Sequence, residues 1–247
     1  HMTNKYMYFI ANWKMYGNLQ SLNTLSKVIK FSKSKEIRKG RLIYCPPYTL
    51  ISSFLKKFQN CLIDIGAQNC HESDDFGPHT GFINAKMLKN VGANYVIIGH
   101  SENREKGETD KIINQKIRSA IRAKLKVIFC IGETLKQKRN GKTKSVLQKQ
   151  IKFGLDKVNK KTNLFIAYEP VWSIGTGKIP KMKDLKQTVK FIKNQFKFKI
   201  PKILYGGSVN PQNIKDLREI KELDGFLIGG ASQNPKKFID IVKKTYN

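Results

Sequence analysis

Eight short apolar runs recur along the chain, and they restrict its fold more than any other feature. Nearly continuous runs of Val, Ile, Tyr and Phe are typical of strands that are buried on both faces of a parallel sheet. The runs cover residues 6–12, 42–45, 62–66, 95–99, 127–131, 164–168, 203–205 and 226–228. They predict eight strands of one parallel sheet.

Between these runs lie stretches with apolar residues at helical spacing. Three such sets are Leu19, Leu22, Leu25 and Ile29; Ile112, Ile113, Ile117 and Ile121; and Leu185, Val189, Ile192 and Phe196. Helix-opening residues agree with them, because Thr109 precedes Asp110 and Asn234 precedes Pro235.

Eight strand–helix alternations imply either a doubly wound sheet or a closed barrel, and their number and the length of 247 residues favour the barrel. We therefore predict an α/β fold, a closed eight-stranded parallel (β/α)8 barrel. We expect a single domain over residues 3–247, since no linker or low-complexity segment divides the chain. We interpret His1 as a cloning remnant and Met2 as the start methionine.

The chain has a formal charge of +29, which raises the question of a nucleic-acid partner. The lysines are scattered over every helix-like stretch, however, and the densest segment, 136–144, lacks interleaved aromatic residues for base stacking. The pattern favours a solvated basic surface that concentrates a small anionic substrate. We expect no nucleic-acid partner, and no membrane partner, because every apolar run is too short to span a bilayer.

Four cysteines, Cys45, Cys61, Cys70 and Cys130, show no CxxC spacing. Three of them lie in or beside the strand-like runs, so we expect buried, reduced thiols in a cytoplasmic protein and no metal site.

Two predicted loops are longer than the two to six residues that are usual in α/β units. Segment 68–84 follows the third run and segment 169–181 follows the sixth. Long loops at the carboxyl ends of barrel strands are typically lids or interaction elements, because this end of a barrel carries the active site.

Polar residues and glycines directly follow five of the runs. In chain order they are Asn12 with Lys14, His100 with Glu102, Glu169, Gly206 to Ser208, and Gly229 to Ala231. Taken singly, each has an ordinary structural explanation, such as a surface lysine, a helix-capping carboxylate or a barrel corner. A barrel brings all of them to one pocket, where the glycine backbone suits a phosphate and the side chains suit proton transfer.

These clusters lie within longer segments that identify a family. From end to end the sequence resembles the triosephosphate isomerase family, through FIANWKMYG, GAQNC, VIIGHSE, VIFCIGET, AYEPVWSIGTGK, ILYGGSVNPQNI and DGFLIGGAS. The resemblance implies a TIM barrel and an intramolecular aldose–ketose isomerase of glycolysis and gluconeogenesis. It further implies interconversion of dihydroxyacetone phosphate and D-glyceraldehyde 3-phosphate through an enediolate, without cofactor or metal.

The resemblance also assigns roles to single residues. Glu169 would be the base, and His100, as a neutral imidazole, would polarise the substrate carbonyl. Lys14 and Asn12 would stabilise the enediolate, while Glu102 would hold Lys14 or relay protons. Backbone N–H groups would bind the phosphate, and they belong to Gly175, Ser208, Gly229 and Gly230.

By the same resemblance the second long loop is a flexible lid that closes over the substrate and excludes water. The lid comprises Pro170, Val171, Trp172, Ser173, Ile174, Gly175, Thr176, Gly177 and Lys178. Ser173 stands where the family usually has Ala, and we expect so small a residue to be harmless there.

Loop 68–84, by resemblance, inserts into the partner subunit of a homodimer, with Thr80 at its tip near the partner's active site. Two positions depart from the family here, because Phe82 replaces a usual Glu and Asn103 replaces a usual Arg. Arg104 could substitute for the missing Arg. Phe82 could pack either on the neighbouring subunit or within its own loop.

Two other functions stay open on the sequence alone. Another phosphate-binding β/α barrel, for example an indole-pathway lyase or isomerase, would share the glycine-rich phosphate site but would lack AYEPVWSIGTGK. A basic nucleic-acid-binding barrel without catalysis would not need Lys14, His100 and Glu169.

Overall fold

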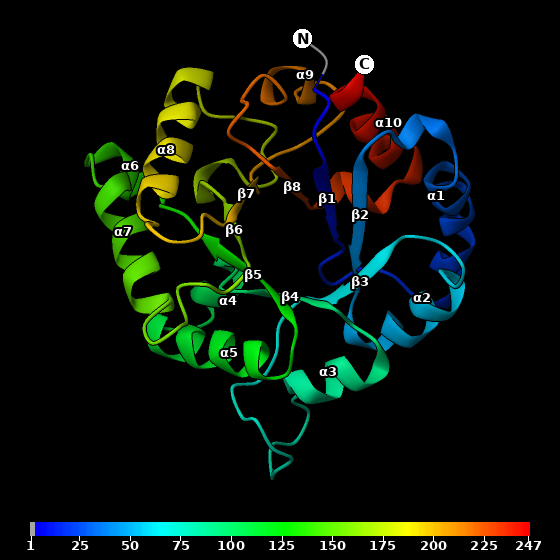
Figure 1. The fold of residues 1–247 in the computed structure, drawn as a ribbon, viewed down its shortest axis with the longest axis horizontal. Coiled ribbons are helices and arrows are strands. Elements are labelled where there is room, and N and C mark those ends of the chain that lie inside the picture. Colours follow the sequence, from blue (N-terminus) through cyan, green and yellow to red (C-terminus); the bar gives the residue numbers. More distant parts are fainter. Residues whose placement is uncertain (1–2) are drawn as a thin grey trace.

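The computed structural model describes residues 3–247, so the interpretation of His1 and Met2 lies outside it. Eight parallel strands pair in chain order, and the last pairs with the first, which closes the barrel. Figure 1 shows the helices as an outer ring around it. The strands are β1 (Met7–Asn12), β2 (Gly40–Cys45), β3 (Asp64–Ala67), β4 (Tyr95–Ile98), β5 (Lys126–Ile131), β6 (Leu164–Tyr168), β7 (Lys202–Tyr205) and β8 (Gly225–Ile228). The predicted (β/α)8 barrel is confirmed.

The outer ring is built from α-helices with short 3-10 segments between them. The α-helices are α1 (Leu25–Ser32), α2 (Ile51–Lys57), α3 (Ala85–Val91), α4 (Ser101–Glu105), α5 (Asp110–Arg122), α6 (Leu135–Arg139), α7 (Thr143–Gly154), α8 (Met182–Asn194), α9 (Ile214–Leu217) and α10 (Pro235–Tyr246). The 3-10 segments are η1 (Leu19–Thr24), η2 (Lys35–Ile37), η3 (Tyr48–Leu50), η4 (Val171–Ser173) and η5 (Gly230–Gln233).

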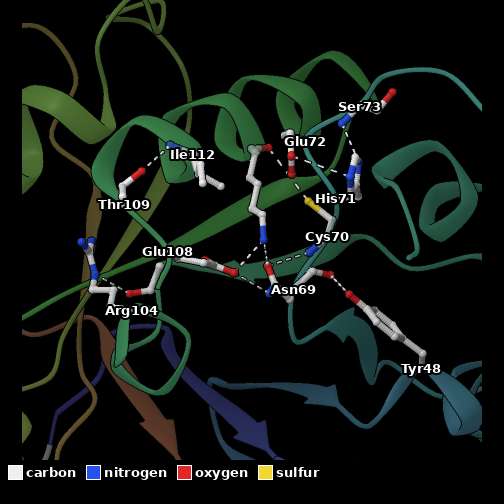
Figure 2. A network of polar contacts seen from close by, with 12 residues as sticks. Tyr48, Asn69, Cys70, His71, Glu72, Ser73, Arg104, Glu108, Thr109 and Ile112 are labelled. Carbon is white, nitrogen blue, oxygen red and sulfur yellow. Dashed lines mark hydrogen bonds and ion pairs between the residues drawn. The ribbon is translucent and has the colours of Figure 1, made fainter. Parts of the chain in front are cut away.

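Both faces of the strands are buried, as their continuous apolar runs predict. In β1, Phe9 belongs to the large core between sheet and helices, whereas Ile10 belongs to the smaller core that fills the barrel. Each fully buried aliphatic or aromatic side chain contributes about 1.5–3 kcal/mol. The two predicted helix openings are also confirmed. Thr109 accepts a hydrogen bond from Ile112 N, visible in Figure 2, and Asn234 accepts one from Lys237 N.

Three predicted boundaries are wrong. The third strand begins at Asp64, where its register with β2 starts, and Leu62 before it is 94% exposed. The predicted helix at Leu19 is a 3-10 segment that opens with an Asn18–Ser21 capping box, and α1 begins only at Leu25. Phe196 follows the end of α8 instead of continuing its apolar stripe.

All four cysteines are free thiols, and Cys45, Cys70 and Cys130 are buried as expected, whereas Cys61 is only partly so. No helix within residues 3–247 has the length and apolarity needed to cross a membrane. Segment 68–84, between β3 and α3, extends away from the barrel as a narrow arm, at the bottom of the view in Figure 1.

Candidate active site

The ends of β1, β4 and β6 bring the predicted polar side chains together. Asn12 is the last residue of β1, and its Oδ1 accepts a hydrogen bond from Lys14 N at 3.0 Å. This tight turn puts Lys14 in the left-handed region, with φ of 58°. Such a conformation is uncommon outside glycine, and it is held here by the Asn12 contact and by Gln68, whose amide donates to Lys14 O at 2.9 Å.

His100 is the N-cap residue of α4, and a hydrogen bond from the backbone of this helix fixes the orientation of its ring. Its Nδ1 accepts a hydrogen bond from Glu102 N at 3.1 Å, so the neutral ring carries its proton on Nε2. The side chain is only 7% exposed, and burial lowers the pKa of His100 to about 4. The expected neutral imidazole is therefore favoured mainly by burial, with the helix N-terminus supplying the hydrogen bond.

Glu169 follows β6 and is fully buried. Its Oε1 accepts a hydrogen bond from Ser101 N at 2.8 Å, and its Oε2 lies 3.1 Å from His100 Nε2. That second oxygen has no hydrogen-bond partner among the described residues. Burial raises the pKa of Glu169 to about 8, which makes this carboxyl a far stronger base than an exposed glutamate.

Lys14 and Glu102 meet above the same pocket. Lys14 Nζ lies 3.1 Å from Glu102 Oε2, while Glu102 Oε1 lies 3.5 Å from His100 Nδ1. The ammonium is 24% exposed and the carboxylate 52% exposed, so solvent screens this pair. The Lys14–Glu102 pair therefore places the Lys14 ammonium at the mouth of the pocket.

A cavity of about 420 Å³ extends from these side chains to the ends of β7 and β8. It is lined by Asn12, Lys14 and His100, and by all four residues predicted to bind phosphate, Gly175, Ser208, Gly229 and Gly230. The loop after Ser208 is fixed because Asn213 Nδ2 donates to Ser208 O at 2.8 Å. The structure thus brings Asn12, Lys14, His100 and the four predicted phosphate residues to one cavity, with Glu169 buried directly behind His100.

The predicted lid covers this cavity from one side. Its first turn is the 3-10 helix η4, and its tip donates a hydrogen bond from Gly177 N to Ser208 Oγ at 3.0 Å. Ile174, Gly175 and Gly177 line the cavity directly. Trp172 Nε1 donates to Glu133 Oε2 at 3.3 Å, and Lys138 Nζ lies 3.8 Å from the Trp172 ring centroid.

Comparison with known proteins shows which family has this sequence and this site. The family model described as triosephosphate isomerase matches residues 7–245. The triosephosphate isomerase of Thermodesulfovibrio yellowstonii is 44% identical over 245 residues, covering 96% of this chain and 98% of the relative. That of Dictyoglomus turgidum is 41% identical over 244 residues, covering 94% and 97%. This chain belongs to the triosephosphate isomerase family.

A solved structure agrees. The crystal structure of triosephosphate isomerase from Bartonella henselae has a TM-score of 0.86 to this fold and 36% sequence identity, and it covers 95% of this chain and 97% of that one. The chain is therefore an isomerase, and the prediction of the family from its motifs is confirmed.

Two residues of this triosephosphate isomerase site were missed from the sequence. Glu133 is buried and its carboxylate accepts hydrogen bonds from Tyr168 OH, at 2.6 and 3.1 Å, as well as from the lid's Trp172. A signal existed, because Glu133 follows a strand run just as Glu169 does. Lys237 also lines the cavity, but among so many lysines nothing in the sequence distinguishes it.

The base of loop 68–84 is tied to the barrel by a polar network, shown in Figure 2. Lys116 Nζ lies 2.6 Å from Glu108 Oε2 and donates to Asn69 Oδ1 at 3.2 Å. Asn69 Nδ2 donates to the same Glu108 oxygen at 3.0 Å, and Tyr48 OH donates to Asn69 O at 2.6 Å. The Lys116 and Glu108 side chains are only 10% and 15% exposed. This closed set of contacts fixes where the loop leaves the barrel.

The suggestion that Arg104 replaces the missing interface arginine is not supported. Arg104 donates to Gly99 O and Cys130 O and pairs with Asp110 at 2.8 Å, all within its own chain. Phe82 contacts the His71 ring edge at 5.1 Å between centroids, yet remains 63% exposed. Its own loop therefore buries only a minor part of the Phe82 side chain.

Proposed function

We propose that this chain interconverts dihydroxyacetone phosphate and D-glyceraldehyde 3-phosphate by proton transfer through an enediolate, with Glu169 as the base. The observation that carries the proposal is the pairing of a buried carboxyl and a neutral imidazole, 3.1 Å apart, where the imidazole lines the same 420 Å³ cavity as the four predicted phosphate-binding residues. The relatives from Thermodesulfovibrio yellowstonii and Dictyoglomus turgidum, both triosephosphate isomerases, support it.

In this mechanism Glu169 removes a proton from the carbon beside the carbonyl and returns it to the neighbouring carbon. His100 donates a hydrogen bond from Nε2 to the carbonyl oxygen, because its Nδ1 is occupied by Glu102 N. The imidazole then moves a proton between the two enediolate oxygens. Burial favours this division of roles, since it makes the carboxyl more basic and keeps the imidazole uncharged.

Lys14 and Asn12 would stabilise the negative charge that develops on the enediolate. Both are held before substrate binds, Asn12 by the Lys14 backbone and Lys14 by Glu102, so little reorganisation accompanies the reaction. We assign Glu102 the role of holding the Lys14 ammonium. Phosphate would be bound by the backbone of Gly175, Ser208, Gly229 and Gly230.

We propose that segment 170–178 is a lid that closes on the bound substrate. Gly175 and Gly177, both at positive φ, allow the tip to turn over the cavity. Closure would exclude water and so protect an enediolate phosphate from losing its phosphate group.

We also propose a homodimer formed through loop 68–84. A second cavity of about 310 Å³ lies beside Asn12, Lys14 and Asn103, and Met15 at its rim is 93% exposed. The loop carries Phe76, 84% exposed, and Phe82, 63% exposed. Insertion of a partner's loop, with Thr80 at its tip, would fill this cavity and cover these apolar side chains.

A coupled assay for formation of glyceraldehyde 3-phosphate tests the proposal. Turnover of dihydroxyacetone phosphate by the purified chain is expected, and its absence would refute the assignment. We place the enzyme in the cytoplasm, in keeping with its four free thiols, and propose that neither nucleic acid nor membrane is its partner.

A further inference from the structure

The first turn of the lid holds a buried pair of hydroxyl groups. Ser173, in η4, is fully buried, and its Oγ lies 3.3 Å from the hydroxyl of Tyr205, the last residue of β7. Ser173 Oγ also donates to Pro170 O at 3.1 Å. Serine has one hydroxyl proton, so both contacts are made together when that proton goes to Pro170 O and the Tyr205 hydroxyl donates to Ser173 Oγ.

This pair is part of the packing of the site. Tyr205 is itself fully buried, and Ser173 Oγ is the one hydrogen-bond partner of its hydroxyl within residues 3–247. The neighbouring Gly207 leaves the space that the two hydroxyls occupy, since a Cβ at that position would overlap both oxygens. A larger residue at position 207 would therefore break the contact.

Hydrogen bonds inside the lid connect this pair to the phosphate end of the cavity. Ser173 O accepts from Thr176 N at 3.3 Å and from Thr176 Oγ1 at 3.0 Å. The next residue, Gly177, donates from its N to Ser208 Oγ. Besides its Trp172–Glu133 contact, the lid is thus attached to Tyr205 and Ser208, which are close together in the same strand-to-loop segment.

We propose that Ser173 is a positioning residue, which latches the lid onto Tyr205 and so increases the fraction of molecules whose lid is docked over Ser208 before substrate binds. The proposal rests on the proposed function for the identity of the substrate. The family usually has Ala at this position, so the serine hydroxyl distinguishes this chain.

The latch has a defined kinetic consequence. A ligand that binds only the docked lid has an apparent dissociation constant that is raised as the docked fraction falls. Loss of one buried hydrogen bond changes such an equilibrium about three- to tenfold. We expect KM to rise by up to that factor while kcat stays within about twofold, because saturating substrate restores the docked lid.

Three variants separate positioning from stability, namely Ser173→Ala, Tyr205→Phe and the double variant. All three lack the hydrogen bond, so all should show the raised KM. Only Ser173→Ala leaves the Tyr205 hydroxyl buried without an acceptor, so its Tm should fall, and the added Tyr205→Phe should recover it. Thr245→Val is the matched control, since it removes a buried hydroxyl in α10 that bonds Ile241 O, and its KM should be unchanged.

A spectroscopic measurement reports the lid without catalysis. The chain has two tryptophans, so protein labelled with 5-fluorotryptophan gives a ¹⁹F resonance from Trp172 in the lid and a reference from Trp13 in the core. In the variants the Trp172 resonance should move from its wild-type position, and titration with glycerol 3-phosphate should return it with weaker affinity.

Wild-type KM and an unmoved Trp172 resonance in Tyr205→Phe and Ser173→Ala would overturn the latch, as would a lower Tm with unchanged KM. A wild type that binds glycerol 3-phosphate but turns over no triose phosphate would refute the proposed function instead.

Discussion

The two long loops at the catalytic end of the barrel are held in different ways. Loop 68–84 leaves the barrel through buried charges, with the Lys116–Glu108 pair and Asn69 at its base (Figure 2). In the part of the chain that the structure describes, the lid has no ion pair at its base and is held mainly by hydroxyl and backbone contacts such as Gly177 N to Ser208 Oγ, with one indole–carboxylate bond from Trp172 to Glu133. Buried charge pairs tolerate little displacement, because a separated charge is costly, whereas a few neutral hydrogen bonds break and reform readily.

The tips of the loops differ as well. The lid turns toward a polar cavity, whereas loop 68–84 exposes Phe76 and Phe82. An arm with a fixed base and an uncovered apolar tip suits attachment to a second subunit, and a lightly held cover suits motion over a substrate.

Glu169→Gln, at the start of the lid segment, should lower kcat by about 10²–10⁴ while substrate binding persists. The amide retains the shape of the side chain but cannot accept a proton. Steady-state kinetics with glycerol 3-phosphate as a competitive ligand would measure both effects. A variant that keeps more than about a tenth of the wild-type kcat would show that Glu169 is not the base.

Lys116→Ala should lower the free energy of unfolding by about 3–5 kcal/mol, because it leaves the Glu108 carboxylate buried without its cation. The double variant Lys116→Met, Glu108→Leu should lie close to the wild type. Urea unfolding at one protein concentration would compare them. Equal stability of Lys116→Ala and wild type would contradict a loop base fixed by charge.

Phe82→Glu should weaken the homodimer by about thirtyfold, which corresponds to about 2 kcal/mol for a lost apolar contact. Phe198→Glu is the control, since Phe198 is similarly exposed, at 70%, and lies outside this loop. Sedimentation equilibrium at several salt concentrations would give both dissociation constants. A wild-type monomer, or an unaffected Phe82→Glu dimer, would refute the proposed interface.

The pH profile of kcat/KM should show the titration of a single enzyme group, Glu169. The pKa of Glu169 is raised to about 8, and catalysis requires its deprotonated form, so kcat/KM should fall about tenfold between pH 8.5 and 7. The pKa of His100 is lowered to about 4, so His100 should add no transition in this range. In Glu169→Asp the pH at which kcat/KM changes should shift. If the transition came from titration of the substrate phosphate, it would occur at the same pH in both enzymes.

Most of the fold and of the active site could be predicted from the sequence, because the strands, the helix starts and the residues at the strand ends depend on short-range sequence patterns. Apolar runs place the strands, Thr109 and Asn234 open helices by local hydrogen bonds, and strand ends determine which polar residues meet. The start of β3 could not be predicted, since the register with β2 decides it and leaves apolar Leu62 outside the sheet.

Tertiary pairing explains the other omissions. Ser173 and Tyr205 are adjacent only because β6 and β7 are neighbours, and no spacing in the sequence indicates that their hydroxyls meet. Lys237 reaches the phosphate end through the position of α10. Arg104 was weighed as an interface residue, but three acceptors in its own barrel hold it.

The most direct test of the account is conversion of dihydroxyacetone phosphate in D₂O by the wild-type chain and by Glu169→Gln, followed by ¹H NMR. The wild type should form D-glyceraldehyde 3-phosphate with deuterium appearing at the carbon beside the carbonyl, because the proton held by Glu169 can exchange with solvent. Glu169→Gln should give neither product nor deuterium on the same timescale. A wild type that leaves dihydroxyacetone phosphate unconverted and undeuterated would contradict the account.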